Sequence, residues 1–211
     1  MPGKYRRVRP ARLPGGRGSG LDDGVAQDDR RPSATAFPFL APRAYAAAVV
    51  YQDIDSPVGR LRLIATDQAL VGIWFEHGRD AARGAAGLTP GSNTIIERTR
   101  AQLAEYFAGT RREFDLPLEP RGTEFQRLVW LRLTKIAYGD TTTYGALAQD
   151  LGNPNGSRAV GLANGSNPIP IVIPCHRVIG ADGALTGFGG GLPIKAMLLD
   201  LERSAIQPRL L

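Results

Sequence analysis

The segment Asn167-Pro-Ile-Pro-Ile-Val-Ile-Pro-Cys-His-Arg177 constrains the fold of this chain more than any other stretch. Its three prolines have a fixed φ and no amide hydrogen, so it cannot form an ordinary helix or a central strand. The single cysteine of the chain, Cys175, follows the third proline, and His176 comes next. The segment therefore predicts a stiff, apolar support that positions one thiol.

A cysteine beside an apolar run is often no more than a small buried hydrophobic residue. The reactive species would be the thiolate, and a nearby imidazole is a common way to generate it. Adjacency of Cys175 and His176 does not decide between these interpretations, because consecutive side chains usually point in different directions. The rigidity of the whole segment favours a positioned, reactive thiol.

The length of 211 residues fits one or two small domains. One cysteine excludes an intramolecular disulfide and a Cys-rich zinc site, and it is typical of a reducing compartment. No run approaches the roughly 18–20 apolar residues that a membrane helix needs. These features predict a globular protein without a membrane partner.

The net charge of +6 is weak evidence for nucleic-acid binding, because it is concentrated at one end. Residues 1–31 hold eight of the 26 basic and four of the 20 acidic residues, which leaves 18 basic and 16 acidic residues elsewhere. We expect residues 1–43 to be a disordered, solvated tail rich in Gly, Pro and Arg. No apolar segment follows Arg6-Arg7, so a secretory signal is not predicted. A second short tail is expected at 206–211.

Residues 44–120 are expected to form a β-sheet domain. Arg60–Ala65 and Leu70–Phe75 predict two strands joined as a hairpin by four residues. Further segments are predicted from composition and periodicity: a β-prone run at Ala46–Gln52, a turn at Ser56–Gly59, a loop at Gly78–Asn93, a helix at Thr94–Ala108 ended by Gly109 and a last strand at Phe114–Leu118. His77 is interpreted as structural or exposed.

Residues 121–205 are expected to be mainly helical. Thr123 is a predicted N-cap for a helix with apolar residues from Phe125 to Ile136, which Gly139 ends. Two short helices, Thr143–Asp150 and Ser157–Asn164, flank a Gly-containing turn and predict a helix-turn-helix. We expect Ser157 to cap the second of these helices.

The second short helix is unusual for a helix that reads bases. Arg158 is its only charged residue, and small residues such as Ala159 and Gly161 dominate. A helix of small residues can approach a backbone or a shallow groove closely. Many helical hairpins bind nothing, however, and a surface ion pair is the alternative interpretation of Arg158.

Two motifs resemble one family. Pro174-Cys-His-Arg-Val178 resembles the active-site signature of the O6-alkylguanine-DNA alkyltransferases, and Asn167-Pro-Ile-Pro170 is similar to their asparagine hinge. The resemblance runs without a gap from about Gly122 to Glu202, and more loosely back to Tyr51. It implies a bacterial-type member with an α+β fold: a small ribonuclease-H-like β-sheet domain and a helical, winged-helix-like domain that contains the helix-turn-helix.

The resemblance implies DNA repair by a methylated-DNA–[protein]-cysteine S-methyltransferase. The alkyl group of O6-alkylguanine, and of O4-alkylthymine, would pass irreversibly to Cys175 after the base is flipped out of the duplex. The thioether product would limit each molecule to one turnover, and the reaction would need no cofactor and no metal. The family resemblance further implies a monomer in the bacterial cytoplasm that binds double-stranded DNA through the minor groove, and it leaves cooperative assembly on DNA open.

The resemblance also assigns roles to individual residues. Cys175 would accept the alkyl group, His176 would act as its base through a water molecule, and Glu202 would orient His176 in a triad. Asn167 would tie the hinge together. From sequence alone, an exposed carboxylate at a helix end is the alternative interpretation of Glu202.

Tyr144 would donate to the flipped guanine, and Arg158 would enter the base stack. Lys195 would lie near the thiol, and Val178 would line the guanine pocket with the loop 186–191. The predicted substrate- and DNA-binding residues are Tyr144, Arg158, Ala159, Gly161, Arg177, Val178, Phe188, Gly189 and Lys195. Phe188 and Gly189 stand where some members have tyrosine and serine, which leaves the tolerance of bulky alkyl groups open.

Three other functions would use some of the same motifs. A lesion-binding protein of the alkyltransferase-like type would recruit other repair factors, but such proteins replace the reactive cysteine. A papain-like hydrolase would need a different motif around Cys175 and an oxyanion hole. A plain helix-turn-helix regulator would leave the Pro-Cys-His segment unexplained.

Overall fold

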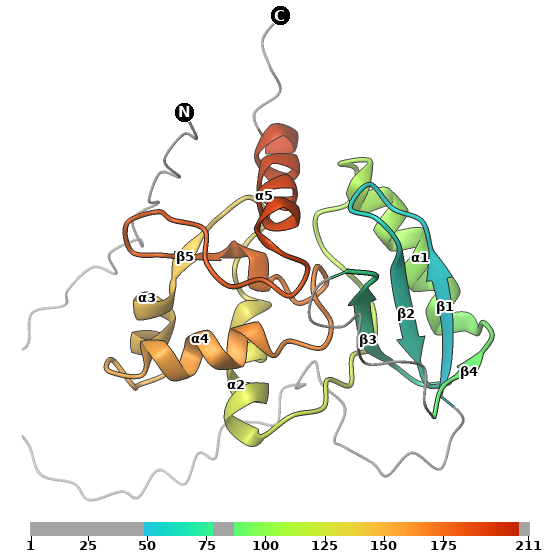
Figure 1. Ribbon diagram of the computed structural model, residues 1–211, viewed down its shortest axis with the longest axis horizontal. Helices are drawn as coiled ribbons and strands as arrows, with labels where there is room; N and C mark the ends of the chain where they lie inside the picture. The colour runs from blue at the N-terminus through green and yellow to red at the C-terminus, as the bar shows by residue number, and fades with distance from the viewer. Residues whose placement is uncertain (1–48, 78–86, 207–211) are drawn as a thin grey trace, which may run out of the picture.

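The computed structural model describes residues 49–77 and 87–206. The predicted tail at 1–43, the C-terminal residues beyond 206 and the first part of the predicted loop 78–93 lie outside these ranges. Within them, no helix is both long and apolar enough to cross a membrane. Figure 1 shows two halves, a sheet with one helix packed on it and a group of helices, with α5 between them in this view.

The first half is built on a four-stranded sheet with the order β3-β2-β1-β4. The strands β1 (Val50–Ile54), β2 (Leu61–Ala65) and β3 (Leu70–Phe75) are antiparallel, and β4 (Thr89–Pro90) pairs parallel with β1. The predicted hairpin of β2 and β3 is confirmed. In the turn before β2, Gly59 has φ +92 and its amide donates to the Ser56 carbonyl, so this turn is also confirmed.

One helix, α1 (Thr94–Phe107), covers this sheet. Asn93 caps it by accepting a hydrogen bond from the Ile96 amide, and Gly109 with φ +74 ends it as predicted. Its buried residues recur every three to four positions: Ile95, Ile96, Thr99, Gln102, Leu103 and Tyr106. This face sets Tyr106 at the end of α1 that lies nearest the second half.

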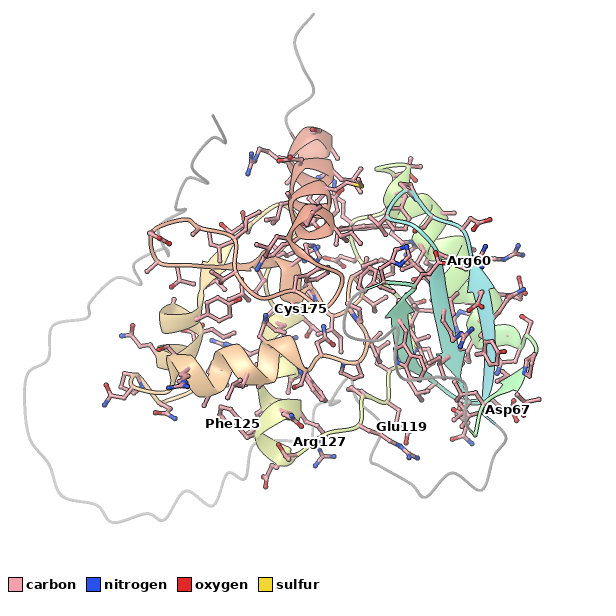
Figure 2. The ribbon with its side chains drawn as sticks, viewed as in Figure 1. Arg60, Asp67, Glu119, Phe125, Arg127 and Cys175 are labelled. Atoms are coloured by element: carbon pink, nitrogen blue, oxygen red, sulfur yellow. The ribbon has the colours of Figure 1, made fainter. Side chains whose placement is uncertain are left out.

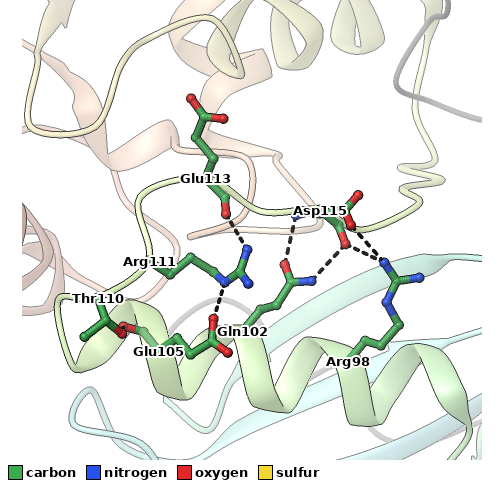
Figure 3. Close-up of polar contacts among 7 residues, drawn as sticks. All are labelled: Arg98, Gln102, Glu105, Thr110, Arg111, Glu113 and Asp115. Carbon is green, nitrogen blue, oxygen red and sulfur yellow. Dashed lines mark hydrogen bonds and ion pairs between the residues drawn. The ribbon is translucent and has the colours of Figure 1, made fainter.

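The strand predicted at Phe114–Leu118 is wrong. In the described chain, only Leu118 of this segment pairs, as an isolated parallel bridge with Leu70. Gln102 of α1 accepts from the Asp115 amide and donates to the Asp115 carbonyl, as Figure 3 shows. These bonds hold Asp115 against the helix, so the contact with β3 is limited to the backbone bonds of Leu70 with Pro117 and Glu119. Pro117 has no amide to donate to a longer ladder.

The second half begins with α2 (Glu124–Leu133). Thr123 and Gln126 form a reciprocal capping box, which confirms the predicted N-cap. The helix ends at Leu133, three residues before the predicted Ile136, and Gly139 with φ +79 follows in the turn. The indole of Trp130 donates to the Ala163 carbonyl and so joins α2 to the helix-turn-helix.

The helix-turn-helix consists of α3 (Tyr144–Asp150) and α4 (Ser157–Gly165). Thr143 caps α3, but the predicted cap of α4 at Ser157 is wrong. Gly156 occupies the N-cap position, and within the described residues no side chain caps this helix. The exposed side chain of Ser157 lies one position inside the helix, too late to act as its cap.

Two short strands and a long helix complete the second half. β5 (Thr142–Thr143) and β6 (Val178–Ile179) pair in parallel, and α5 (Leu192–Ile206) ends at the first residue of the tail predicted at 206–211. One apolar core joins the sheet, α1 and the helical half. The mixed α+β architecture agrees with the predicted fold class.

Candidate active site

The proline-rich segment supports Cys175, and hydrogen bonds of Asn167 hold its strained backbone in place. Asn167 Nδ2 donates to the Ile173 carbonyl at 2.8 Å, and Asn167 Oδ1 accepts from the Ile169 amide at 3.0 Å. Ile171 has φ +74, a left-handed conformation that costs a β-branched residue about 1–3 kcal/mol. Such a conformation persists only where its surroundings enforce it, and the two bonds of Asn167 close the turn around it.

Cys175 opens a 3-10 turn that ends at Arg177. Its side chain is buried, with 4% of the residue exposed, and its amide donates to the Ile173 carbonyl at 2.8 Å. Asn164 of α4 donates its side-chain amide to the Cys175 carbonyl at 3.4 Å. Figure 2 shows Cys175 near the middle of the molecule, below α5 in this view. The thiol is therefore held by the hinge on one side and the helix-turn-helix on the other.

His176 and Glu202 form a fully buried pair, with His176 Nε2 2.9 Å from Glu202 Oε1. Burial opposes the charge on Glu202, but the bonds from His176 and Arg177 outweigh it and hold the pKa of Glu202 well below its ordinary value. An ionised carboxylate can only accept hydrogen bonds, so Nε2 of His176 carries the hydrogen. Nδ1 is then the nitrogen with a free lone pair.

Five hydrogen bonds converge on the Glu202 carboxylate. Oε1 accepts from Tyr106, His176 and Arg177 at 2.8, 2.9 and 2.8 Å, and Oε2 accepts from Arg177 and from the Gly139 amide, both at 2.9 Å. These donors come from α1, from the turn after α2 and from the Cys-His-Arg turn. The exposed carboxylate that sequence alone favoured for Glu202 is therefore wrong.

The surroundings keep His176 neutral. Burial lowers the pKa of His176, and the charges of Arg177 and Lys195 act in the same direction, whereas Glu202 opposes them. Nδ1 is buried and has no hydrogen-bond partner among the residues that the structure describes. A neutral imidazole with an unused lone pair can take up a proton.

The sequence assigned Arg177 to DNA binding, and this interpretation is corrected. Its guanidinium is buried, makes two bonds to Glu202 and donates to the Ile136 carbonyl at 2.6 Å. It also lies over the ring of Tyr138, 5.6 Å from the centroid. Arg177 is thus turned inward, where it balances the charge of Glu202 instead of meeting phosphates.

Lys195 of α5 fixes the loop beside the thiol. Its ammonium is buried and donates to the carbonyls of Val178 and Thr186, each at 2.6 Å. Burial lowers the pKa of Lys195 to about 8, and the nearby Cys175 opposes this shift. The Tyr144 hydroxyl donates to the same Thr186 carbonyl at 3.2 Å. Tyr144 and Lys195 therefore meet at the start of the glycine-rich loop.

Phe188 links this loop to the sheet and to His176. Its ring lies edge-on to Phe75 of β3 at 5.5 Å and to His176 at 6.4 Å between centroids. A Cβ on Gly190 would meet the Phe75 ring at 3.0 Å, so glycine allows the loop to lie against it. Gly189 is half-buried, and Val178 is fully buried beside the Cys-His-Arg turn.

The second helix of the helix-turn-helix presents a small, largely uncharged face. Arg158 and Ala159 are exposed, and 71% of Leu162 is exposed one turn beyond Arg158. Within residues 49–77 and 87–206, Arg158 has no ion-pair partner, contrary to the surface-pair interpretation. Gly161 lies against Tyr144, because a Cβ there would be 3.7 Å from its ring.

Several residues of this site were not identified from sequence. The sequence assigns no role to Tyr106, Phe75 or Leu162; Tyr106 and Phe75 only fit the apolar patterns of a predicted helix and a predicted strand. Nothing local marks the first two, although a buried tyrosine usually needs a partner for its hydroxyl. In the described parts of the chain, no cluster of His, Cys, Asp and Glu could hold a metal ion.

Two family models match the chain. The model of the 6-O-methylguanine DNA methyltransferase ribonuclease-like domain matches residues 49–120, and that of the 6-O-methylguanine DNA methyltransferase DNA binding domain matches residues 124–204. Together they span both halves of the fold.

Individual relatives agree with these matches. The methylated-DNA–protein-cysteine methyltransferase of Methanosarcina acetivorans is 47% identical over 154 residues, which are 73% of this chain and 98% of the relative. That of Mycolicibacterium paratuberculosis is 48% identical over 156 residues, 74% of this chain and 93% of the relative. The crystal structure of Mycobacterium tuberculosis OGT in complex with DNA has a TM-score of 0.69 at 46% identity, and covers 74% of this chain and 94% of its own.

Proposed function

The chain belongs to the 6-O-methylguanine DNA methyltransferase family. From this premise we propose that the thiol of Cys175 accepts the alkyl group when the protein repairs alkylated DNA. The observation that carries the proposal is the arrangement around the thiol. Cys175 opens a turn that hydrogen bonds hold in place, and the neutral His176 follows it directly. Nε2 of His176 is hydrogen-bonded to the ionised Glu202, which leaves Nδ1 available. This arrangement suits the generation of a thiolate at a fixed place.

The transfer is a single displacement. The proton of the Cys175 thiol passes to Nδ1 of His176, and the thiolate attacks the alkyl carbon bonded to guanine O6. The S–C bond forms as the C–O6 bond breaks, and the bonding electron pair stays on O6. The guanine anion takes up one proton from solvent, and the imidazolium of His176 returns the thiol proton to solvent. The product is a thioether at Cys175, so each molecule reacts once.

Burial of Cys175 supports base flipping. An alkyl group on O6 of a paired guanine lies inside the duplex, and a thiol in a residue that is only 4% exposed cannot reach it there. The damaged nucleotide must therefore leave the stack and enter the protein. The same route would admit O4-alkylthymine, whose alkyl group occupies a similar position on the base.

The exposed face of α4 supports binding in the minor groove. Ala159 is exposed and small enough to allow a close approach, whereas Gly161 faces Tyr144, and Arg158 is free to enter the gap that the flipped base leaves. A DNA complex is known for the Mycobacterium tuberculosis relative, and we extend DNA as the partner to this chain. Phosphate contacts then give affinity with little base reading, as suits lesions in any sequence.

The loop 186–191 and its neighbours form the proposed guanine pocket. Phe188 offers a ring to stack on the base, and Gly189 lets backbone groups approach its edge. Tyr144 would exchange its bond to the Thr186 carbonyl for one to the guanine, while Lys195 keeps that carbonyl in place. These residues would stabilise the leaving guanine as the thiolate attacks.

Intact-protein mass spectrometry tests the proposal. The full chain is incubated with a duplex that carries one O6-methylguanine, and we expect a gain of one methylene mass on the peptide of Cys175, with one equivalent of lesion consumed. The Cys175→Ala variant should bind the duplex with unchanged affinity and gain no mass. Lesion-selective binding without any gain would indicate a non-transferring binding protein, and release of product over many turnovers would indicate a hydrolase.

A further inference from the structure

The ribonuclease-like half contributes one hydrogen bond to the centre of the candidate active site. Tyr106 lies near the end of α1, and its hydroxyl donates to Glu202 Oε1 at 2.8 Å. Glu202 belongs to α5, 96 residues further along the chain. Both side chains are fully buried, so water does not compete for this bond.

Packing alone does not explain a tyrosine at this position. The ring contacts Phe107, Phe114 and Tyr138, with centroids 5.4, 5.5 and 5.9 Å away, and a phenylalanine would fill the same space. A buried hydroxyl costs free energy unless it finds a partner. Burial and the adjacent charge of Glu202 raise the pKa of Tyr106, so the hydroxyl stays protonated and remains a donor.

The Tyr106 hydroxyl donates to the same oxygen of Glu202 as His176 Nε2 does. Oε1 of Glu202 accepts from Tyr106, from His176 Nε2 and from Arg177 Nη2, whereas Oε2 accepts from Arg177 Nε and the Gly139 amide. Without the Tyr106 hydroxyl, the donors that remain would draw the carboxylate towards Arg177. The bond that orients the imidazole would then lengthen or bend.

We propose that Tyr106 is a positioning residue for alkyl transfer, which holds Glu202 so that His176 presents Nδ1 to the thiol proton. The inference rests on the proposed function, because it acts through the base assigned there. It gives the ribonuclease-like half a part in the chemistry through one hydroxyl, beyond support of the fold.

The test compares Tyr106→Phe with Tyr138→Phe in the full chain. Both changes remove one buried hydroxyl from the same aromatic cluster, but the Tyr138 hydroxyl has no hydrogen-bond partner in the described residues. Single-turnover rates of alkyl transfer from free O6-benzylguanine are measured from pH 6 to pH 9.5. This substrate leaves DNA binding out of the measurement.

We expect Tyr106→Phe to slow transfer about tenfold near pH 7, the loss that follows from one charged hydrogen bond. The difference should narrow towards pH 9.5, because solvent then ionises the thiol without help from His176. Tyr138→Phe should match the parent protein throughout. A uniform loss at every pH, or none, would overturn the inference, because a purely structural effect does not depend on the base.

A double-mutant cycle with Glu202→Gln tests whether the effect of Tyr106→Phe passes through Glu202. If Tyr106 acts through Glu202, Tyr106→Phe should cost less than twofold in the Glu202→Gln background, and additive losses would contradict this. Failure of the proposed function is distinguishable, because the parent protein itself would then gain no alkyl group on Cys175. A parent that reacts, beside a Tyr106→Phe variant with an unchanged pH profile, rejects only the role of Tyr106.

Discussion

His176 Nε2 donates to Glu202 Oε1 across 2.9 Å, with both side chains fully buried. The direction of this bond fixes which nitrogen of His176 can accept a proton. Glu202 remains ionised because its pKa lies well below the ordinary range, and His176 remains neutral because burial lowers its pKa. The resting site therefore holds a base, ready to take one proton from Cys175.

Glu202→Gln should slow alkyl transfer at neutral pH and move the rise of the pH–rate profile to higher pH. The amide cannot stabilise a proton on His176 as a carboxylate does, so ionisation of Cys175 would depend more on the solvent. The variant should also lose about 3–5 kcal/mol in the free energy of unfolding, since Arg177 stays buried without a counter-charge. Stopped-flow transfer rates and urea titrations measure the two effects.

Glu113→Gln is the matched control, because Glu113 is exposed and, among the described residues, only its backbone carbonyl takes part in a hydrogen bond, which it accepts from Arg111. It should leave the pH–rate profile and the free energy of unfolding unchanged. If Glu202→Gln kept the pH profile of the parent protein, Glu202 would not act on the base, whatever its effect on stability.

Arg158→Ala should slow transfer from a lesion in duplex DNA at least tenfold more than transfer from free O6-benzylguanine. Arg158 lies on the exposed face of α4 and would fill the space left by the flipped nucleotide, which a free base does not require. Arg100→Ala, the same change of charge on an exposed position of α1, should affect neither substrate. Equal losses on the two substrates would argue against insertion into the base stack.

Local signals in the sequence predicted most of the elements. The β2–β3 hairpin followed from two apolar runs around a four-residue turn, and α1 followed from its helical period and from Gly109. The strand predicted at 114–118 was wrong because Asp115 bonds to Gln102 and only Leu118 forms a bridge, contacts that strand propensity does not report. Ser157 was wrong because Gly156 already occupies the cap position.

The convergence on Glu202 could not be predicted from sequence. Its donors come from positions 106, 139, 176 and 177, and no spacing rule relates them. Arg177 has the positive charge that is typical of a DNA-binding residue. Only its burial and its hydrogen bonds in the folded chain show that it faces Glu202. Family resemblance located Cys175, His176 and Glu202, whereas the part of Tyr106 depends on how the two halves pack.

Gly190→Ala should slow transfer from free O6-benzylguanine several-fold. The new methyl group would lie 3.0 Å from the buried ring of Phe75, so the loop that carries Phe188 must shift. Phe75→Leu in the same chain should restore part of the rate, because the smaller side chain makes room. Gly145→Ala, where nothing lies within 4 Å of the added carbon, is the control. A normal rate for Gly190→Ala would mean that the loop position does not limit transfer.

As the pH falls, the protein should first lose stability because of the His176 side chain, and only at lower pH because of the Glu202 side chain. The pKa of His176 is lowered in the folded state from 6.5, so below about pH 6.5 the unfolded chain binds more protons than the folded one. Above this pH, the neutral state of His176 makes its full contribution to the free energy of unfolding. As the pH falls, the free energy of unfolding decreases by up to about 1.4 kcal/mol per pH unit. Glu202 adds its own loss only below about pH 4.5, where the unfolded chain begins to take up that proton.

Urea titrations at pH 7.5, 6.5 and 5.5 measure this slope in the parent protein and in two variants. His176→Gln keeps a donor for Glu202 but cannot titrate, so its free energy of unfolding should vary much less over this range. His77→Gln is the matched control, because 86% of the His77 side chain is exposed, and the slope of the parent should remain. If His77→Gln rather than His176→Gln flattened the slope, the neutral state inferred for His176 would be wrong, and with it the proton acceptor proposed for Cys175.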